Sequence, residues 1–202
     1  MTDSFKHLPQ ADLLQLGFAA MQRDDDASAV VYLKEAADRP DASAQALFLL
    51  GSLYAQLRMA DAGIETITRA LALDPGYTLA RFQLGMLHLT SGDADAALVV
   101  WEPLRQLAED DAFRVWRQGL EHLIRDEFDA AIGCLREGLV LNTQNEALSR
   151  DMRMLIERIE ARESKPAAAA NLSTATQAQD AASELDNMSH LFLSVYTKGR
   201  TH

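Results

Sequence analysis

The apolar positions of this chain follow the period of an amphipathic helix, and the same arrangement returns at a constant interval along the sequence. In the stretch ALFLLGSLYAQ, Leu47, Leu50 and Tyr54 are spaced so that they share one helical face. A short polar turn follows, and Ile64 and Ile67 then begin the apolar stripe of a second helix. The pattern therefore predicts pairs of amphipathic helices, repeated along the chain.

A glycine recurs in the first helix of each pair, although glycine inside a helix costs about 1 kcal/mol relative to alanine. Gly17, Gly51, Gly85 and Gly119 are equally spaced in the sequence. We interpret the missing side chain as room for the second helix to approach closely. The residues twelve places on are Ala29, Gly63, Ala97 and Ala131, and those sixteen places on are Leu33, Ile67, Trp101 and Leu135.

The second unit, ALFLLGSLYAQLRMADAGIETITRALALDP, carries Leu50–Gly51, Tyr54, Gly63, Ala70 and Pro75 and resembles the tetratricopeptide repeat. The resemblance implies an all-α fold, a right-handed superhelical solenoid of helix–turn–helix units, and a non-catalytic protein-binding scaffold. The expected divisions are an N-terminal extension 1–9, four units at 10–43, 44–77, 78–111 and 112–145, a capping helix 146–163, a flexible linker 164–184, and an apolar docking tail 185–202.

The expected capping helix has its apolar residues, among them Leu148, Met152 and Leu155, at helical spacing. A solenoid end needs such a helix, apolar inward and charged outward, for solubility. We expect its opposite side to face solvent, with Arg150, Asp151, Arg153, Glu157, Arg158 and Glu160.

In solenoids of this family the first helix of each unit lines a concave face. The columns that are not needed for packing within a pair hold mostly apolar residues here, which predicts a groove for a peptide. In the alternative, these residues pack between adjacent helices. The groove residues are Leu14, Phe18, Met21, Phe48, Ser52, Phe82, Met86, Leu89, Phe113, Trp116, Leu120 and Leu123.

The tail gathers apolar residues that cannot form a core alone. From Asn187 to His202 it has two cations and no acids, whereas the rest of the chain carries all 30 acids and the remaining 17 bases, a charge of −13. A linker of about 21 residues spans roughly 25 Å, so the tail reaches a groove in cis, or in trans within a homodimer. The alternatives to this docking are that the tail is a binding motif for another protein, or that it is a disordered end. The tail motif is Met188, Leu191, Phe192, Leu193, Val195 and Tyr196.

The formal charge of −11 argues against nucleic acid, whose binding needs cations on the protein surface. No apolar run approaches the length that a membrane-spanning helix needs, and the N-terminus has no apolar signal region. We therefore expect no membrane insertion and a cytoplasmic location. The single cysteine, Cys134, fits a reducing compartment.

Catalysis or metal binding needs converging groups, and the histidines and carboxylates are scattered. We therefore expect no enzyme activity, no cofactor and no metal. Family members that grip acidic peptides use a clamp of Lys, Arg and Asn. Here the clamp columns hold Leu14, Phe18, Ser52 and Phe82, with Arg117 the nearby cation. The expected ligand is therefore apolar and neutral to basic.

These features predict a bacterial-type adaptor or chaperone-like protein that binds an apolar peptide segment. The chain resembles the repeat-containing chaperones of specialised secretion systems, although those usually have three units and no such tail. The alternative is an assembly scaffold that homo-oligomerises through the tail and binds partners on another face.

Overall fold

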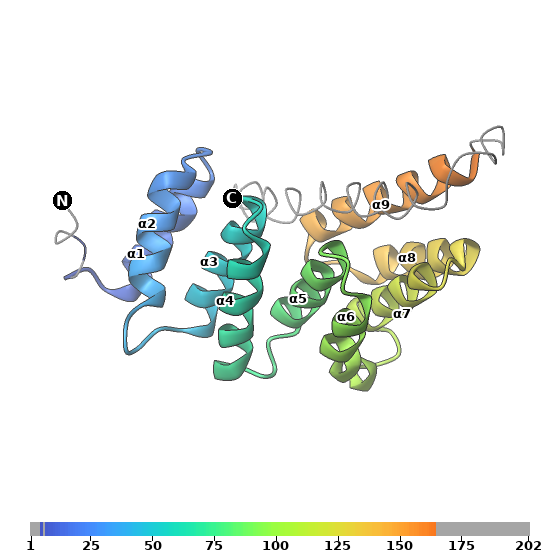
Figure 1. The fold of residues 1–202 in the computed structure, drawn as a ribbon, viewed down its shortest axis with the longest axis horizontal. Helices are drawn as coiled ribbons and strands as arrows, with labels where there is room; N and C mark the ends of the chain where they lie inside the picture. The colour runs from blue at the N-terminus through green and yellow to red at the C-terminus, as the bar shows by residue number, and fades with distance from the viewer. Residues whose placement is uncertain (1–4, 6, 165–202) are drawn as a thin grey trace.

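The structure is a computed structural model that describes residues 5 and 7–164. Within this part of the chain the regular elements are helices. The expected all-α solenoid of helix pairs is confirmed (Figure 1). The tail motif Met188–Tyr196, and the expected linker beyond Ser164, lie outside the described residues. The elements are α1 (Gln10–Met21), α2 (Asp26–Ala37), α3 (Ala44–Gln56), α4 (Ala60–Leu73), α5 (Thr78–Thr90), α6 (Ala94–Trp101), the 3-10 helix η1 (Glu102–Gln106), α7 (Ala112–Ile124), α8 (Phe128–Leu141) and α9 (Glu146–Ser164).

The helices form an extended row in which each pair packs on the next, and α9 packs on α8 (Figure 1). In this view α1 to α4 stand nearly upright, whereas α7 to α9 lie closer to the horizontal. The direction of the helices therefore changes along the row, as a superhelix requires.

The glycine column is where the two helices of each pair touch. A β-carbon added at Gly51 would lie 2.6 Å from Cγ1 of Ile67, and one added at Gly85 would overlap the indole of Trp101. Gly17 and Gly119 stand in the same way against Leu33 and Leu135. These four larger side chains have no exposed surface. The interpretation of the glycines as points of close approach is confirmed.

All four pairs close with the same turn, and its key residue sits seven places after each glycine. Asp24, Arg58, Gly92 and Asp126 have φ between 56° and 84°, the left-handed region. The next amide then bonds back to the first helix, as Asp93 N–H does to His88 O at 2.9 Å. This is the helix-ending motif in which glycine is preferred, yet only one of these four turns uses it.

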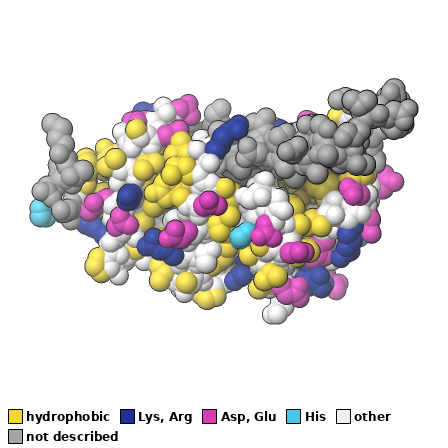
Figure 2. Space-filling model, in the orientation of Figure 1, with side chains coloured by type: hydrophobic (Ala, Val, Ile, Leu, Met, Phe, Trp, Pro, Cys, Tyr) yellow, Lys and Arg dark blue, Asp and Glu magenta, His cyan; other side chains and the backbone are white. Residues whose placement is uncertain are grey.

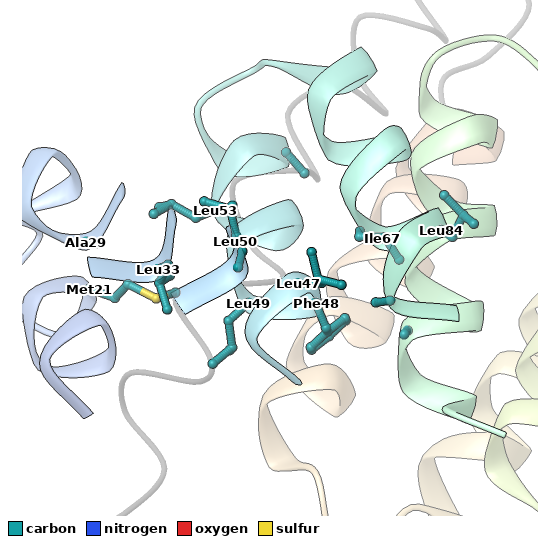
Figure 3. Packing of buried hydrophobic residues seen from close by; sticks show 14 of the residues in the cluster. Met21, Ala29, Leu33, Leu47, Phe48, Leu49, Leu50, Leu53, Ile67 and Leu84 are labelled. Atoms are coloured by element: carbon teal, nitrogen blue, oxygen red, sulfur yellow. The ribbon is translucent and has the colours of Figure 1, made fainter. Parts of the chain in front are cut away.

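A first hydrophobic cluster joins the two N-terminal pairs. Leu33, Leu53 and Ile67 are fully buried in it, and Leu47 and Phe48 are nearly so (Figure 3). The labelled side chains come from helices of both pairs and from α5, which supplies Leu84. The stack is therefore one continuous core across these helices rather than separate hairpins.

The third pair departs from the repeat, because its second helix, α6, has 8 residues, whereas α2, α4 and α8 have 12 to 14. Pro103 lacks the amide hydrogen that would continue α6, and the chain forms η1 instead. Contacts from this segment then reach α7: Arg105 pairs with Glu121 at 3.1 Å, and Arg114 Nη1 donates to Leu107 O at 2.7 Å. Polar contacts thus supplement helix packing at this junction.

We expect Gly85→Ala to lower the free energy of unfolding by about 2 kcal/mol, because the new methyl group would displace the buried Trp101. Gly133→Ala is the matched control. Gly133 is also inside a helix, but it is exposed and has open space around it. The control should gain up to about 1 kcal/mol from helix propensity. Urea unfolding measures both changes, and equal effects would contradict the close approach.

We expect Gly92→Ala to lower the free energy of unfolding by about 1 kcal/mol, since a side chain is strained at its φ of 84°. Its space is open, so no clash contributes. The reciprocal change, Asp126→Gly, should raise it by a few tenths of a kcal/mol to about 1 kcal/mol. Thermal unfolding of the pair measures both shifts, and a loss at both sites would contradict a shared turn geometry.

Candidate functional site

The twelve expected groove residues divide into a buried set and a partly exposed set. Leu14, Phe18, Phe113 and Leu123 keep part of their surface exposed. The others are 9% exposed or less, and for them the structure shows the alternative in which they pack between helices. The buried set is Met21, Phe48, Ser52, Phe82, Met86, Leu89, Trp116 and Leu120.

Four aromatic rings from α5, α6 and α7 form an aromatic cluster of Phe82, Trp101, Phe113 and Trp116. Phe82 stacks on Trp101 with ring centroids 6.1 Å apart, and it lies 5.4 Å from Phe113 and 6.0 Å from Trp116. Phe113 meets Trp116 edge to face at 5.9 Å. Phe113 is the partly exposed member, so a ligand can reach the cluster through this ring.

The two tryptophans occupy exchanged positions in successive pairs. Trp101 lies sixteen residues after its glycine and donates its indole N–H to Phe82 O, three residues before that glycine, at 2.9 Å. In the next pair Trp116 stands three residues before the glycine and donates to Leu135 O, sixteen after it, at 3.2 Å. Gly138 leaves room for the Trp116 ring. Both indoles are thus buried with their polar group satisfied.

Ser52, one of the expected groove residues, makes a polar contact inside the stack of helices. Its hydroxyl donates to Gln83 Oε1 at 3.1 Å, across from α3 to α5, and both side chains are buried. Ser52, which we expected in the groove, is therefore engaged in a contact between two helices. A buried polar pair of this kind fixes the register of two neighbouring helices, because separating it leaves both groups unpaired.

The apolar side of α9 joins the aromatic cluster in a second hydrophobic cluster. Leu148, Met152 and Leu155 are buried there together with Phe82 and Trp116. The inward apolar side that the sequence predicts for this helix is present. The expected charged outer side is wrong at one residue, because Asp151 is only 1% exposed. Burial raises the pKa of Asp151 to about 7.

Arg117, the cation nearest to the clamp columns, is 4% exposed and pairs with Glu121. Burial lowers the pKa of Arg117, although Glu121 opposes this shift. Because Glu121 also pairs with Arg105, this arginine belongs to an internal ion network rather than to an open anion site.

The described residues hold no group of three histidine, cysteine or acidic side chains that could bind a metal ion. Burial raises the pKa of the half-buried Cys134 thiol, which disfavours the nucleophilic thiolate. His122 Nδ1 contacts Glu127 at the turn between α7 and α8. Within the described helices, none is long and apolar enough to cross a membrane.

Known proteins support the same fold. Residues 44–77, which are α3, α4 and their flanking turns, match the sequence model of the tetratricopeptide repeat family. This segment of the chain is therefore similar to one tetratricopeptide repeat. The fold and this match support a protein-interaction module. No curated protein matches its sequence.

Solved structures with this fold include MamA. One MamA crystal structure is 25% identical, with a TM-score of 0.55 over 65% of this chain and 77% of that one. MamA from Desulfovibrio magneticus RS-1, residue 41 to the end, is 18% identical, with a TM-score of 0.56 over 88% of this chain and 95% of that one. These likenesses show a shared fold, a solenoid of helix pairs.

We expect Ser52→Ala to lower the free energy of unfolding by about 1–2 kcal/mol, because it leaves the Gln83 amide buried without its partner. The double variant Ser52→Ala/Gln83→Leu should recover part of this loss, since both polar groups are then gone. Urea unfolding measures the natural protein, the single variants Ser52→Ala and Gln83→Leu, and the double variant. If the double variant loses the sum of the two single losses, the pair is not coupled.

Proposed function

We propose that this protein is a non-catalytic adaptor or chaperone-like module that binds an apolar peptide segment along its first helices. The observation that carries the proposal is the aromatic cluster with its partly exposed ring, Phe113. Aromatic side chains bury a large area for little conformational entropy and are enriched at binding surfaces. We place the protein in the cytoplasm, where its half-buried cysteine stays reduced.

The N-terminal half of the same columns offers a second apolar area. Leu14 and Phe18 of α1 are partly exposed, and Figure 2 shows hydrophobic side chains gathered over α2 to α4 on the face in view. Acidic side chains are spread across this face. Because like charges repel across an interface, a ligand with apolar side chains and few acids fits this surface best.

The chain's own segment 185–202 has this chemistry and is our first candidate ligand, in cis or exchanged within a dimer. It combines Leu191, Phe192 and Leu193 with two cations and, from Asn187 onward, no acid. An assembly scaffold, in which this segment links copies of the chain, is the second candidate function. The two differ in the mass of the particle in solution.

A labelled peptide of residues 185–202, titrated into a chain that ends at Glu184, tests the proposed function. Binding should change the fluorescence anisotropy, and Phe113→Ala or Leu123→Ala should weaken it about 10-fold. Val99→Ala is the matched control, because Val99 is 74% exposed on α6, away from the expected columns. Circular dichroism establishes that each variant keeps its helices.

Light scattering of the full chain and of the chain ending at Glu184 separates the two functions. A groove ligand in cis leaves both as monomers, and exchange in trans makes only the full chain a dimer. Larger particles that require the tail would favour the scaffold. If the peptide does not bind and both proteins have the same mass, the segment is not a ligand of this surface.

A further inference from the structure

Asp151 is a buried carboxylic acid without a hydrogen-bond partner among the described residues. It is 1% exposed, and neither Oδ1 nor Oδ2 accepts a hydrogen bond. An ionised carboxylate is strongly disfavoured in such a place, because burial removes its hydration and no hydrogen bond replaces it. Burial accordingly raises the pKa of Asp151 to about 7, against an ordinary value of 3.8. The side chain is therefore neutral in mildly acidic solution and ionises near neutral pH.

The repeat explains why Asp151 has no partner where it lies. Gln83 and Arg117 hold the same position in the two preceding first helices, at the interval of the repeat, and both are buried. Gln83 accepts a hydrogen bond from Ser52 of α3, and Arg117 has an ion-pair partner within α7. The residue of α7 that corresponds to Ser52 is Leu120, which is apolar and fully buried. At the junction of α7 and α9 the repeat therefore supplies no hydroxyl for the carboxyl group.

The charged groups on the helices around Asp151 are engaged with one another. Arg150, which is exposed on α9, is the charged group that acts on Asp151, and it lowers the pKa against the larger effect of burial. Glu137 of α8 acts on the Cys134 thiol. The ion pairs are Arg117–Glu121 and His122–Glu127 from α7, Arg136–Glu160 between α8 and α9, and Arg153–Glu146 on α9. No described cation therefore neutralises this carboxylate directly.

Asp151 lies on the side of α9 that closes the second hydrophobic cluster. Leu148, three residues before it, and Leu155, four residues after it, are buried in this cluster together with Phe82 and Trp116. Among the described elements α9 is the last, and it packs on α8 (Figure 1). A helix at the end of a solenoid opens more readily than one in the middle, because it has a neighbour on one side only. Ionisation of Asp151 therefore acts on the docking of α9 first.

We propose that Asp151 makes the docking of α9 depend on pH, so that the helix closes the second hydrophobic cluster when the carboxyl group is protonated and loosens when it is ionised. Loosening uncovers residues of the expected groove columns, Trp116 and Leu120 among them. The pH would then set how much apolar surface a ligand can reach. This consequence deepens the proposed function and rests on it, whereas the docking itself requires no ligand.

The direction of the effect follows from the two states of the helix. In the docked helix the pKa of Asp151 is about 7, and in the released helix the carboxyl group returns to its ordinary 3.8. Protons therefore favour docking, which is strongest below about pH 4, weakens as the pH rises from there, and is weakest above about pH 7. Between these limits the docking constant falls about 10-fold per pH unit.

Hydrogen exchange of the full chain, followed by mass spectrometry of peptides from α9, tests this pH dependence. After correction for the intrinsic exchange rate, the protection of α9 in the natural chain should fall on the order of 50-fold between about pH 5 and about pH 7. In Asp151→Asn, which is neutral at both pH values, the protection should stay unchanged. At about pH 7 this variant should therefore be better protected than the natural chain.

The matched control is Glu157→Gln, which removes an exposed carboxylate from the same helix and should keep the fall of the natural chain. Asp151→Leu is a second neutral variant and should hold α9 at both pH values. Peptides from α3, which lies in the first cluster, should keep their protection throughout. The same fall in α9 of both neutral variants, or an equal fall in α3 of the natural chain, would overturn the proposal. Circular dichroism establishes that each variant keeps its helices.

The proposed function fails separately, when the peptide of residues 185–202 does not bind the chain ending at Glu184. If the peptide binds, its affinity for that chain should be higher at about pH 7 than at about pH 5. The same chain with Asp151→Asn should lack this rise, because α9 stays docked. Titration of both chains with the labelled peptide measures the difference. An equal pH dependence in both would show that α9 does not control the surface.

Discussion

The close approach of two helices at a glycine is the contact on which the rest of this structure depends. Each glycine of the column faces a fully buried side chain sixteen residues later, and the small residues twelve places on let the backbones meet. Helix pairs held this tightly act as rigid units, and stacking them buries a continuous core. The left-handed residue seven places after each glycine is followed by the same backbone hydrogen bond to the first helix in all four pairs. Regular pairs and regular turns together produce the extended row of helices.

The C-terminal half modifies this plan with aromatic residues. Trp101 and Trp116 exchange positions between neighbouring pairs, and each indole finds a backbone carbonyl in the opposite helix. Pro103 ends α6 early, and ion pairs from η1 to α7 contribute to the junction that follows. The apolar side of α9 then closes over the same region. Most expected groove residues in this half are thereby buried, and Phe113 and Leu123 remain at the edge where a ligand can reach them.

The proposed binding function rests on surface chemistry. The described residues offer apolar side chains within an acidic body, and an arginine that is already paired with a glutamate. In the function we propose, such a surface selects against acidic peptides by charge and in favour of apolar ones by burial. The chain's own C-terminal segment is apolar and, from Asn187 onward, has no acidic residue in its sequence.

The sequence by itself determined the repeat, the helix pairs and their contact columns, because a glycine that recurs at a constant interval is a local pattern. It could not determine which columns stay open. Phe82 and Phe113 are both apolar and at helical spacing, yet one is buried and the other partly exposed, since that depends on how neighbouring helices cross. Asp25 caps α2 by accepting the Ser28 amide at 3.1 Å, a contact that a sequence can predict because capping needs only residues nearby in the chain. Asp151 was expected in solvent and is buried, because only tertiary packing sets how wide a face of α9 is covered.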